Sequence, residues 1–319
     1  MKYRALGKTG MNVSALSFGA SSLGSVFRET DDKEAVRTVH AAVDAGMNLI
    51  DVSPYYGATK AETVLGRAIR DIARDRFFLS TKAGRYGEDC FDFSRARIEA
   101  SLEASLRRLN TDYVDILFLH DIEFVEPTII LEEAIPTLHR LKEKGTIRKA
   151  GICGLPLSLF EQLLPQADVD AIISYCHYSL NDNSLLSLLP LLDARGVGLV
   201  NASPLSMGLL SMRGTPEWHP ASAEIKEACQ SAARLCAERG TDIAKLAVQY
   251  STSNERIPTT LVSTANPDNI VRNTAWVDEP MDEALLADVL EVLAPIHNRT
   301  WPSGVPRYNE HIRNEESRR

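Results

Sequence analysis

Four ionisable side chains follow short apolar runs of the sequence, at the points where strands are expected to end. Asp51 and Tyr56 follow one such run, Lys82 a second and His120 a third. The segment 51–57 is more than a simple connection, because it places a carboxylate at the end of a strand and a phenol one proline-containing bend later. In an α/β barrel the carboxyl ends of the strands form the face that carries the chemistry. The spacing therefore predicts that these side chains converge on one site.

The residue types indicate proton transfer. A tyrosine has a reference pKa of about 10, too high for ready proton exchange at neutral pH, but a neighbouring lysine ammonium favours the phenolate and lowers that pKa. An aspartate paired with Lys82 would keep it charged and in place, and His120 could orient a substrate oxygen by a hydrogen bond. The pattern contains no metal site, thiol nucleophile or serine triad. It fits proton transfer at a carbonyl or carbinol carbon, coupled to hydride transfer to a cofactor.

Each of these residues also has a structural interpretation when it is taken alone. Asp51 and Tyr56 could form a satisfied turn. A lysine after a strand is often a solvated strand end, and a single histidine there is often structural. Four such groups at the same end of three adjacent strands are hard to explain by packing, so their convergence favours a catalytic site.

The elements that must position these residues alternate along the chain. Apolar residues recur with helical spacing in 33–45, 60–73, 94–109, 130–144, 184–194 and 222–238. Short apolar runs typical of strands occupy 15–18, 47–50, 77–81, 113–119, 147–152, 170–174, 197–201 and 259–263. Repeated β-α units favour a parallel sheet with right-handed crossovers. Eight of them predict an α/β fold, a closed (β/α)8 TIM barrel, with a doubly wound open sheet as the alternative.

The start of the chain and its uniform composition indicate how many domains to expect. Residues 3–14 predict a small N-terminal hairpin around a Gly-Lys-Thr-Gly turn. No Gly-x-Gly-x-x-Gly follows any strand, which counts against a Rossmann domain. No linker or change of composition divides the chain. We therefore expect a single barrel domain, 1–319, with C-terminal loop and helix additions.

The composition limits the classes of function. A hydrophobic content of 44% and a charged content of 24% are ordinary for a globular protein, and a net charge of −8 argues against a nucleic-acid partner. The chain carries no signal-peptide pattern and no apolar run of membrane-spanning length. Five scattered cysteines lack the spacing of a zinc site. We expect reduced thiols, a cytoplasmic protein and no bound metal.

The chain resembles the aldo-keto reductases, which are barrel oxidoreductases that bind a nicotinamide cofactor without a Rossmann domain. The resemblance covers nearly the whole chain and implies that Asp51, Tyr56, Lys82 and His120 form the catalytic tetrad of that family. The stretches that carry it are the opening hairpin, 18–20, 51–57, 81–82, 112–117 with His120, and 202–210.

A finer likeness is to the sugar 1-dehydrogenases of this family, the L-galactose dehydrogenase and the L-fucose (D-threo-aldose) type. The stretches 81–86, 173–178 and 216–222 carry it. It implies oxidation of the anomeric carbon to a lactone, with Tyr56 accepting the C1 hydroxyl proton. It leaves open which aldose is used, or whether the substrate is a pyridoxal-type or other small alcohol. The alternatives are an NADPH-dependent aldehyde or ketone reductase and a cofactor-sensing potassium-channel subunit, against which the missing N-terminal extension counts.

The same resemblance implies the cofactor contacts. They would come from Ser174, Tyr175, Ser203, Leu205, Gly208, Ser263, Asn269 and Asn273. Ser263 and Asn269 stand where NADP-dependent relatives carry a Lys and an Arg for the 2′-phosphate, so the strong phosphate contacts are absent and NAD is expected over NADP. Arg272, one helical turn further, could substitute. Cys153, Tyr175 and Ala202 also depart from the common nicotinamide-binding pattern.

A sugar ring needs several hydrogen-bond partners and an aromatic face. The candidates are Asp121, Tyr86, His177, Trp218 and Trp301, with Arg85 also on this face. Asp121 follows His120 directly, and together with Trp218 it is the preferred candidate.

Two connections are longer than the repeat requires. Segments 203–221 and 295–308 each carry a tryptophan, Trp218 in the first and Trp301 in the second. Such long connections on a barrel often cover the site. The alternative is a surface loop whose tryptophan fills the space beneath it.

Overall fold

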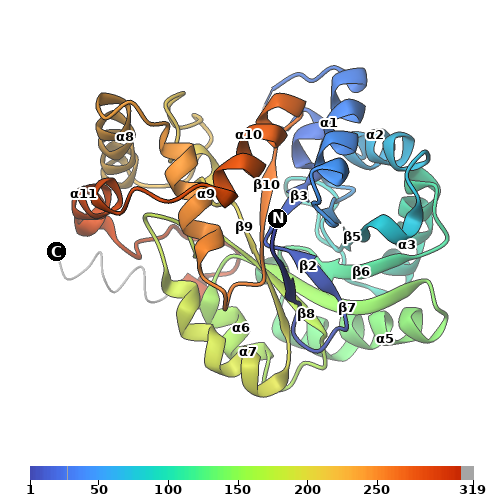
Figure 1. Ribbon diagram of the computed structural model, residues 1–319. Helices are drawn as coiled ribbons and strands as arrows, with labels where there is room; N and C mark the ends of the chain where they lie inside the picture. The colour runs from blue at the N-terminus through green and yellow to red at the C-terminus, as the bar shows by residue number, and fades with distance from the viewer. Residues whose placement is uncertain (27, 310–319) are drawn as a thin grey trace.

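In the computed structural model, which describes residues 1–26 and 28–309, eight parallel strands close into a barrel (Figure 1). The barrel strands are β3 Leu16–Gly19, β4 Leu49–Asp51, β5 Phe78–Ala83, β6 Val114–Leu119, β7 Ile147–Gly154, β8 Ala171–Tyr175, β9 Gly198–Ala202 and β10 Thr259–Ser263. They neighbour one another in sequence order, and β10 closes on β3. The predicted barrel is therefore confirmed, and the alternative of an open sheet is wrong.

The predicted N-terminal hairpin is also present. It consists of β1 Tyr3–Ala5 and β2 Asn12–Ser14, which pair antiparallel with Tyr3 opposite Ser14. Apolar side chains of the hairpin pack with residues inside the barrel: Leu6, Met11 and Val13 lie in one buried cluster with Leu49 and Ile116. The hairpin thus closes one end of the barrel and leaves the other end for the site.

Helices follow nearly every strand. They are α1 Asp32–Asp44, α2 Lys60–Ile69, α3 Arg95–Leu109, α4 Pro127–Ile129, α5 Ile135–Glu143, α6 Leu157–Leu163, α7 Leu189–Arg195, α8 Ala223–Glu238, α9 Ile243–Ser253, α10 Pro267–Asp278 and α11 Glu283–Leu293. The six helical segments predicted from apolar spacing all contain helix. Within the described residues, no helix is both long and apolar enough to cross a membrane.

Besides the three-residue α4, four helices were not predicted from apolar spacing: α6, α9, α10 and α11. Three of them begin at side-chain caps that the sequence offers as a signal: Asp242 accepts from Ala244 N, Asn266 from Asp268 N, and Asp282 from Leu285 N. The fourth, α6, has only 7 residues, too few to establish a period. The C-terminal additions are nevertheless as expected, because α8 and α11 lie side by side away from α1–α3 (Figure 1).

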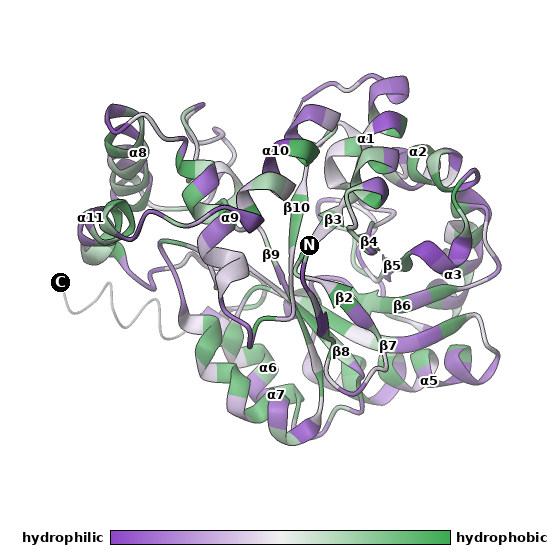
Figure 2. Ribbon diagram, viewed as in Figure 1, coloured by the Kyte–Doolittle hydropathy of each residue, from purple (hydrophilic) through white to green (hydrophobic). Residues whose placement is uncertain are grey.

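The apolar residues form an inner and an outer layer around the strands. One buried cluster fills the barrel interior, and a larger one lies between the strands and the helices. Figure 2 shows hydrophobic residues along the strands, and bands of both kinds on helices such as α3 and α5. Parallel strands buried on both faces read as near-continuous apolar runs, which is why those runs predicted the strands well.

Candidate active site

Strand alternation places three members of the predicted tetrad inside the barrel. Successive side chains of a strand point to opposite faces, and the interior cluster contains Leu49 of β4, Phe78 of β5 and Phe118 of β6. Residues an even number of positions further along each strand therefore also face inward. These are Asp51, Lys82 and His120, each less than 5% exposed. They lie above an apolar floor at the carboxyl ends of adjacent strands.

Lys82 and Asp51 form a buried ion pair, as the sequence predicts. The Lys82 ammonium donates to Asp51 Oδ2 and to the carbonyl of Val52 at 3.1 Å. Ser80 Oγ donates to the other carboxylate oxygen at 2.7 Å. Burial lowers the pKa of Lys82, whereas Asp51 and then Tyr56 raise it. The two raising effects together exceed the lowering, so the pKa of Lys82 lies above its ordinary value. The lysine is therefore held both charged and fixed.

Tyr56 completes the group from the segment that follows β4. Its ring centroid lies 5.0 Å from Lys82 Nζ and 5.7 Å from the ring of His120, which meets it edge-on. Gly57 fixes the end of this segment: it has φ +60°, and a Cβ there would lie 1.9 Å from the carbonyl oxygen of Gly24. Only glycine allows this close approach.

The pKa of Tyr56 corrects one expectation from the sequence. Burial raises this pKa above its ordinary value, and Lys82 lowers it by less. The lysine acts in the expected direction, but desolvation of the phenolate is the larger effect. Tyr56 is therefore a neutral phenol at physiological pH in this structure.

His120 is also neutral. Burial is the main cause that lowers its pKa to about 3, although the nearby Asp121 raises it. Its Nδ1 lies 3.0 Å from Ser53 Oγ and its Nε2 3.8 Å from Asp121 Oδ2. A neutral, fixed imidazole can share a hydrogen bond with a substrate oxygen without adding charge.

The sequence-predicted Asp121 lies next to the tetrad and is joined to Arg85, another candidate, and through Arg85 to Tyr55, which was not a candidate. Arg85 Nη1 donates to Asp121 Oδ2 at 2.5 Å, and Arg85 Nη2 donates to the Tyr55 hydroxyl at 3.0 Å. The guanidinium also lies 4.0 Å from the Tyr55 ring centroid. Arg85 had been noted as a candidate, whereas Tyr55 was missed. Its position beside Tyr56 was the available signal.

Glu123 is a second residue that the sequence analysis missed. It is fully buried, and its Oε1 accepts from Leu155 N at 3.2 Å and from Ser303 Oγ at 2.9 Å. Tyr175 OH donates to the same oxygen at 3.4 Å. Burial and then Asp121 raise the pKa of Glu123 to about 8, so the carboxyl is largely protonated at neutral pH. It ties the C-terminal segment to the edge of the site.

The structure separates the two cofactor candidates at the end of β8. Tyr175 packs with the interior cluster, and its hydroxyl lies 3.4 Å from Asp121 Oδ1. Ser174 precedes it and by alternation faces the helices instead. The structure therefore does not bring Ser174 to the site, because its place on the strand points the hydroxyl outward.

The other predicted cofactor residues follow β9 and β10. Ser203 has φ +58° in the turn after β9, and Leu205 and Gly208 follow it along the same connection. The exposed Ser263 accepts from Ser21 Oγ at 2.8 Å and from Ser22 N at 2.9 Å.

The first turns of α10 hold Asn269 and Asn273. Asn269 Nδ2 donates to Thr264 Oγ1 at 3.0 Å, and its carbonyl oxygen accepts from Arg272. Backbone N–H groups at a helix N-terminus favour phosphate. Hydroxyls, amides, one cation and this helix N-terminus form a donor set that fits a dinucleotide, and these residues could hold one.

The predicted substrate residues are spread more widely than expected. Tyr86 packs under the guanidinium of Arg97 of α3, 4.1 Å away. Trp218 is 55% exposed and stacks on His219 at 5.8 Å. His177 and Trp301 are buried and line a cavity that none of the tetrad residues lines. Within the described part of the chain, Asp121 is the predicted substrate residue that contacts the tetrad, and the role of the others stays a prediction.

One group of possible metal ligands occurs among the described residues. Donor atoms of His120, Asp121 and Cys153 lie within 4.8 Å of one another. Arg85 already pairs with this aspartate, and the Lys82 charge lowers the pKa of His120. Two cations beside the cluster disfavour a third, so the absence of a metal remains our prediction.

The profile of the Aldo/keto reductase family matches residues 15–294. The L-galactose dehydrogenase of Arabidopsis thaliana is 48% identical over 314 residues, covering 96% of this chain and 98% of that protein. The D-arabinose 1-dehydrogenase of Saccharomyces cerevisiae is 38% identical over 259 residues, 76% of each. The holo form of an aldo-keto reductase from Bacillus halodurans has a TM-score of 0.78 at 26% identity, covering 97% of this chain and 99% of that one.

Proposed function

Because this chain belongs to the aldo/keto reductase family and is an oxidoreductase acting on a CH–OH group, we propose that it oxidises the anomeric carbon of an aldose to a lactone. The observation that carries the proposal is the buried Asp51–Lys82 pair beside the Tyr56 ring and the neutral His120. The sugar dehydrogenases among its relatives support an aldose as the substrate.

In the proposed reaction, the side chains of the chain bind the sugar and move one proton. His120 shares a hydrogen bond with the C1 oxygen and orients it. Tyr56, after losing its own proton, takes the proton of the C1 hydroxyl as a phenolate; the C1–H bond breaks, its hydride would pass to the nicotinamide, and the carbonyl of the lactone forms. Lys82, kept charged by Asp51, stabilises the phenolate through which this transfer passes. A bound oxidised nicotinamide supplies the hydride acceptor and a positive charge.

NAD is the cofactor that we propose. Ser263, Asn269 and Asn273 would face its adenosine half, and none of them offers the charge that a 2′-phosphate needs. Arg272 is the cation nearest to this position, and it donates to Asn269. Ser203, Leu205, Gly208 and Tyr175 would contact the rest of the cofactor.

The sugar is proposed to be of the L-galactose or L-fucose type. Asp121, Arg85 and Tyr55 form a fixed polar group beside His120. Carboxylate, guanidinium and phenol together can accept from and donate to neighbouring ring hydroxyls. This arrangement suits a polyhydroxylated substrate better than a simple aldehyde.

A second candidate, an NADPH-dependent aldehyde or ketone reductase, has one observation in its favour. The raised pKa of Tyr56 keeps its proton in place, and a protonated phenol is the acid that carbonyl reduction needs. The two candidates run the same chemistry in opposite directions.

Initial-rate measurements with a panel of aldoses, using NAD and NADP separately, test the proposal. Rapid NAD reduction with L-galactose, L-fucose or D-arabinose is the expected result. NADPH consumption with simple aldehydes, and no oxidation of any sugar, would contradict the proposal and support an aldehyde or ketone reductase instead. A cytoplasmic location belongs to the same proposal, and the five free cysteines support it.

A further inference from the structure

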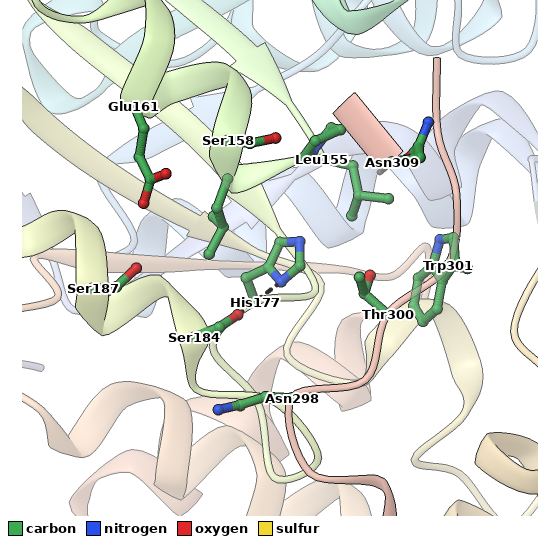
Figure 3. A pocket seen from close by; sticks show the side chains of 12 residues that line it. Leu155, Ser158, Glu161, His177, Ser184, Ser187, Asn298, Thr300, Trp301 and Asn309 are labelled. Carbon is green, nitrogen blue, oxygen red and sulfur yellow. Dashed lines mark hydrogen bonds between the residues drawn. The ribbon is translucent and has the colours of Figure 1, made fainter. Parts of the chain in front are cut away.

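A cavity of about 320 Å³ lies beside the catalytic site but apart from it. Its walls come from the start of α6, the connection after β8 and the C-terminal segment, and none of the tetrad residues lines it (Figure 3). Its volume is within the usual range of small-ligand pockets, roughly 300–1,000 Å³. The cavity is therefore large enough for one small molecule.

An unpartnered imidazole nitrogen belongs to this cavity. His177 is 3% exposed, and its Nδ1 lies 3.1 Å from Asp182 Oδ2 and 3.0 Å from Ser184 Oγ. Its Nε2 is buried and has no hydrogen-bond partner among the described residues. Figure 3 shows this ring between Ser184, Leu155 and Thr300. Asp182 holds the proton on Nδ1, which leaves Nε2 as an acceptor for a hydroxyl donor.

A second polar atom is left in the same state. Thr300 Oγ1, also in the cavity wall, is buried without a partner in the described part of the chain. A buried polar atom left without a hydrogen bond destabilises the folded state. Two of them in one wall point to a ligand or water that satisfies both.

The charge and chemistry of the wall indicate the class of ligand. Glu161 is the one charged side chain among the described residues that line the cavity, and they include no Lys or Arg. An anion such as a phosphate would find no counter-charge here. The other lining groups include serine hydroxyls, asparagine amides and the indole of Trp301. His219 meets this indole edge-on, with 4.8 Å between the ring centroids. Hydroxyl and amide groups around an aromatic face suit a neutral polyol.

We propose that this cavity binds a neutral, hydroxyl-rich molecule of monosaccharide size, as a second site distinct from the catalytic one. Hydroxyl groups of the ligand donate to His177 Nε2 and Glu161 and pair with Thr300 Oγ1. The proposal goes beyond the proposed function, because it requires neither the tetrad nor the cofactor.

The second site shares structure with the edge of the catalytic site. Leu155 lines the cavity, and its backbone N–H donates to Glu123. Asn309 lines it too, and accepts from the backbone of Ser303, whose hydroxyl donates to the same carboxyl group. A ligand that fills the cavity would therefore contact Leu155 and Asn309, two residues whose hydrogen bonds hold the C-terminal segment in place.

The probe for this site is galactitol, a hexitol that has no anomeric carbon and so cannot give a lactone. We would titrate it into protein labelled with ¹⁵N-histidine and follow the ring signals of His177, assigned with a His177→Gln variant. We expect a saturable shift of the His177 signal with galactitol and none with inorganic phosphate. No shift with galactitol, or an equal shift with phosphate, would overturn the proposal.

Two variants locate the binding. Ser187 lines the cavity and is exposed, so Ser187→Leu places a larger apolar side chain in the cavity wall without disturbing the core. It should weaken galactitol binding at least tenfold. The matched control is Ser253→Leu, an exposed serine at the end of α9, which should bind as the wild type does. Equal affinities for wild type and Ser187→Leu would contradict the assignment. This binding test requires no turnover, so its outcome does not depend on whether the protein oxidises a sugar.

Discussion

The ammonium group of Lys82 lies 5.0 Å from the ring centroid of Tyr56, close enough to lower the pKa of the phenol but not to offset its burial. The same lysine is paired with Asp51 inside the barrel. The site therefore holds a fixed positive charge beside a proton that is hard to remove. The oxidation that we propose depends on how this balance is shifted.

Tyr56→Phe should reduce turnover about 10²- to 10⁴-fold, because a positioned proton-transfer group contributes about that factor. Cofactor affinity should stay nearly unchanged, since the hydroxyl serves the proton and not the cofactor. Steady-state kinetics and cofactor titration measure the two effects. Wild-type turnover in this variant would remove the role assigned to Tyr56.

The rate of sugar oxidation should rise with pH between about 6 and 10, because the raised pKa of Tyr56 keeps the phenolate scarce at neutral pH. Reduction of a carbonyl by the same enzyme should instead stay nearly constant over that range, since the phenol with its raised pKa remains protonated throughout. The profiles of kcat against pH for both directions provide the measurement. Parallel profiles would show that another group titrates.

Asp121→Asn should raise the KM for the sugar about tenfold. The substitution removes the anion that orients Arg85, so the guanidinium is no longer held beside the site. The value of kcat should change less. The matched control is Asp44→Asn, which breaks the exposed pair with Arg76 at 3.0 Å and should leave both constants unchanged. An unaltered KM in Asp121→Asn would mean that this carboxylate does not position the substrate.

Asn269→Arg combined with Ser263→Lys should raise the affinity for NADP relative to NAD by about tenfold or more, since two cations would meet the 2′-phosphate. Dissociation constants for both cofactors give the ratio. Asn12→Arg with Ser253→Lys adds the same charge at exposed positions elsewhere and serves as the control. An unchanged ratio in the first variant would show that the adenosine half binds in another place.

Glu123→Gln should remove a pH dependence of stability. The pKa of Glu123 is raised from 4.5 to about 8 in the folded protein, so the unfolded chain releases this proton first. Its stabilising contribution is complete below pH 4.5 and is lost as the pH rises towards 8, by a few kcal/mol at most. Denaturant unfolding across that window should show a smaller loss in the variant.

The control for this prediction is Glu126→Gln. Glu126 is half exposed and pairs with Arg307 at the surface, so its replacement should leave the slope of stability against pH as in the wild type. If Glu123→Gln and the wild type lose stability equally between those pH values, Glu123 is ionised in the folded protein.

The apolar runs and the residues at their ends were sufficient to predict the barrel and the positions of the four tetrad residues. Parallel strands buried on both faces appear as apolar runs, and Lys82 and His120 each stand directly after or at the end of such a run, so their convergence follows from the fold class alone. The same reasoning was insufficient for Ser174, since whether a residue at a strand end faces inward depends on the register of that strand with its neighbours.

The sequence by itself thus determined the fold class, the family and the four residues to which we assign the proposed chemistry, because residue type and period are properties of short segments. Only the tertiary structure decided the charge states and the surroundings of those residues. The raised pKa of Tyr56, the protonated Glu123 and the cavity around His177 all arise where segments distant in the chain exclude water together. Burial of that kind is not encoded in any single segment, and it sets the free energy of each proton.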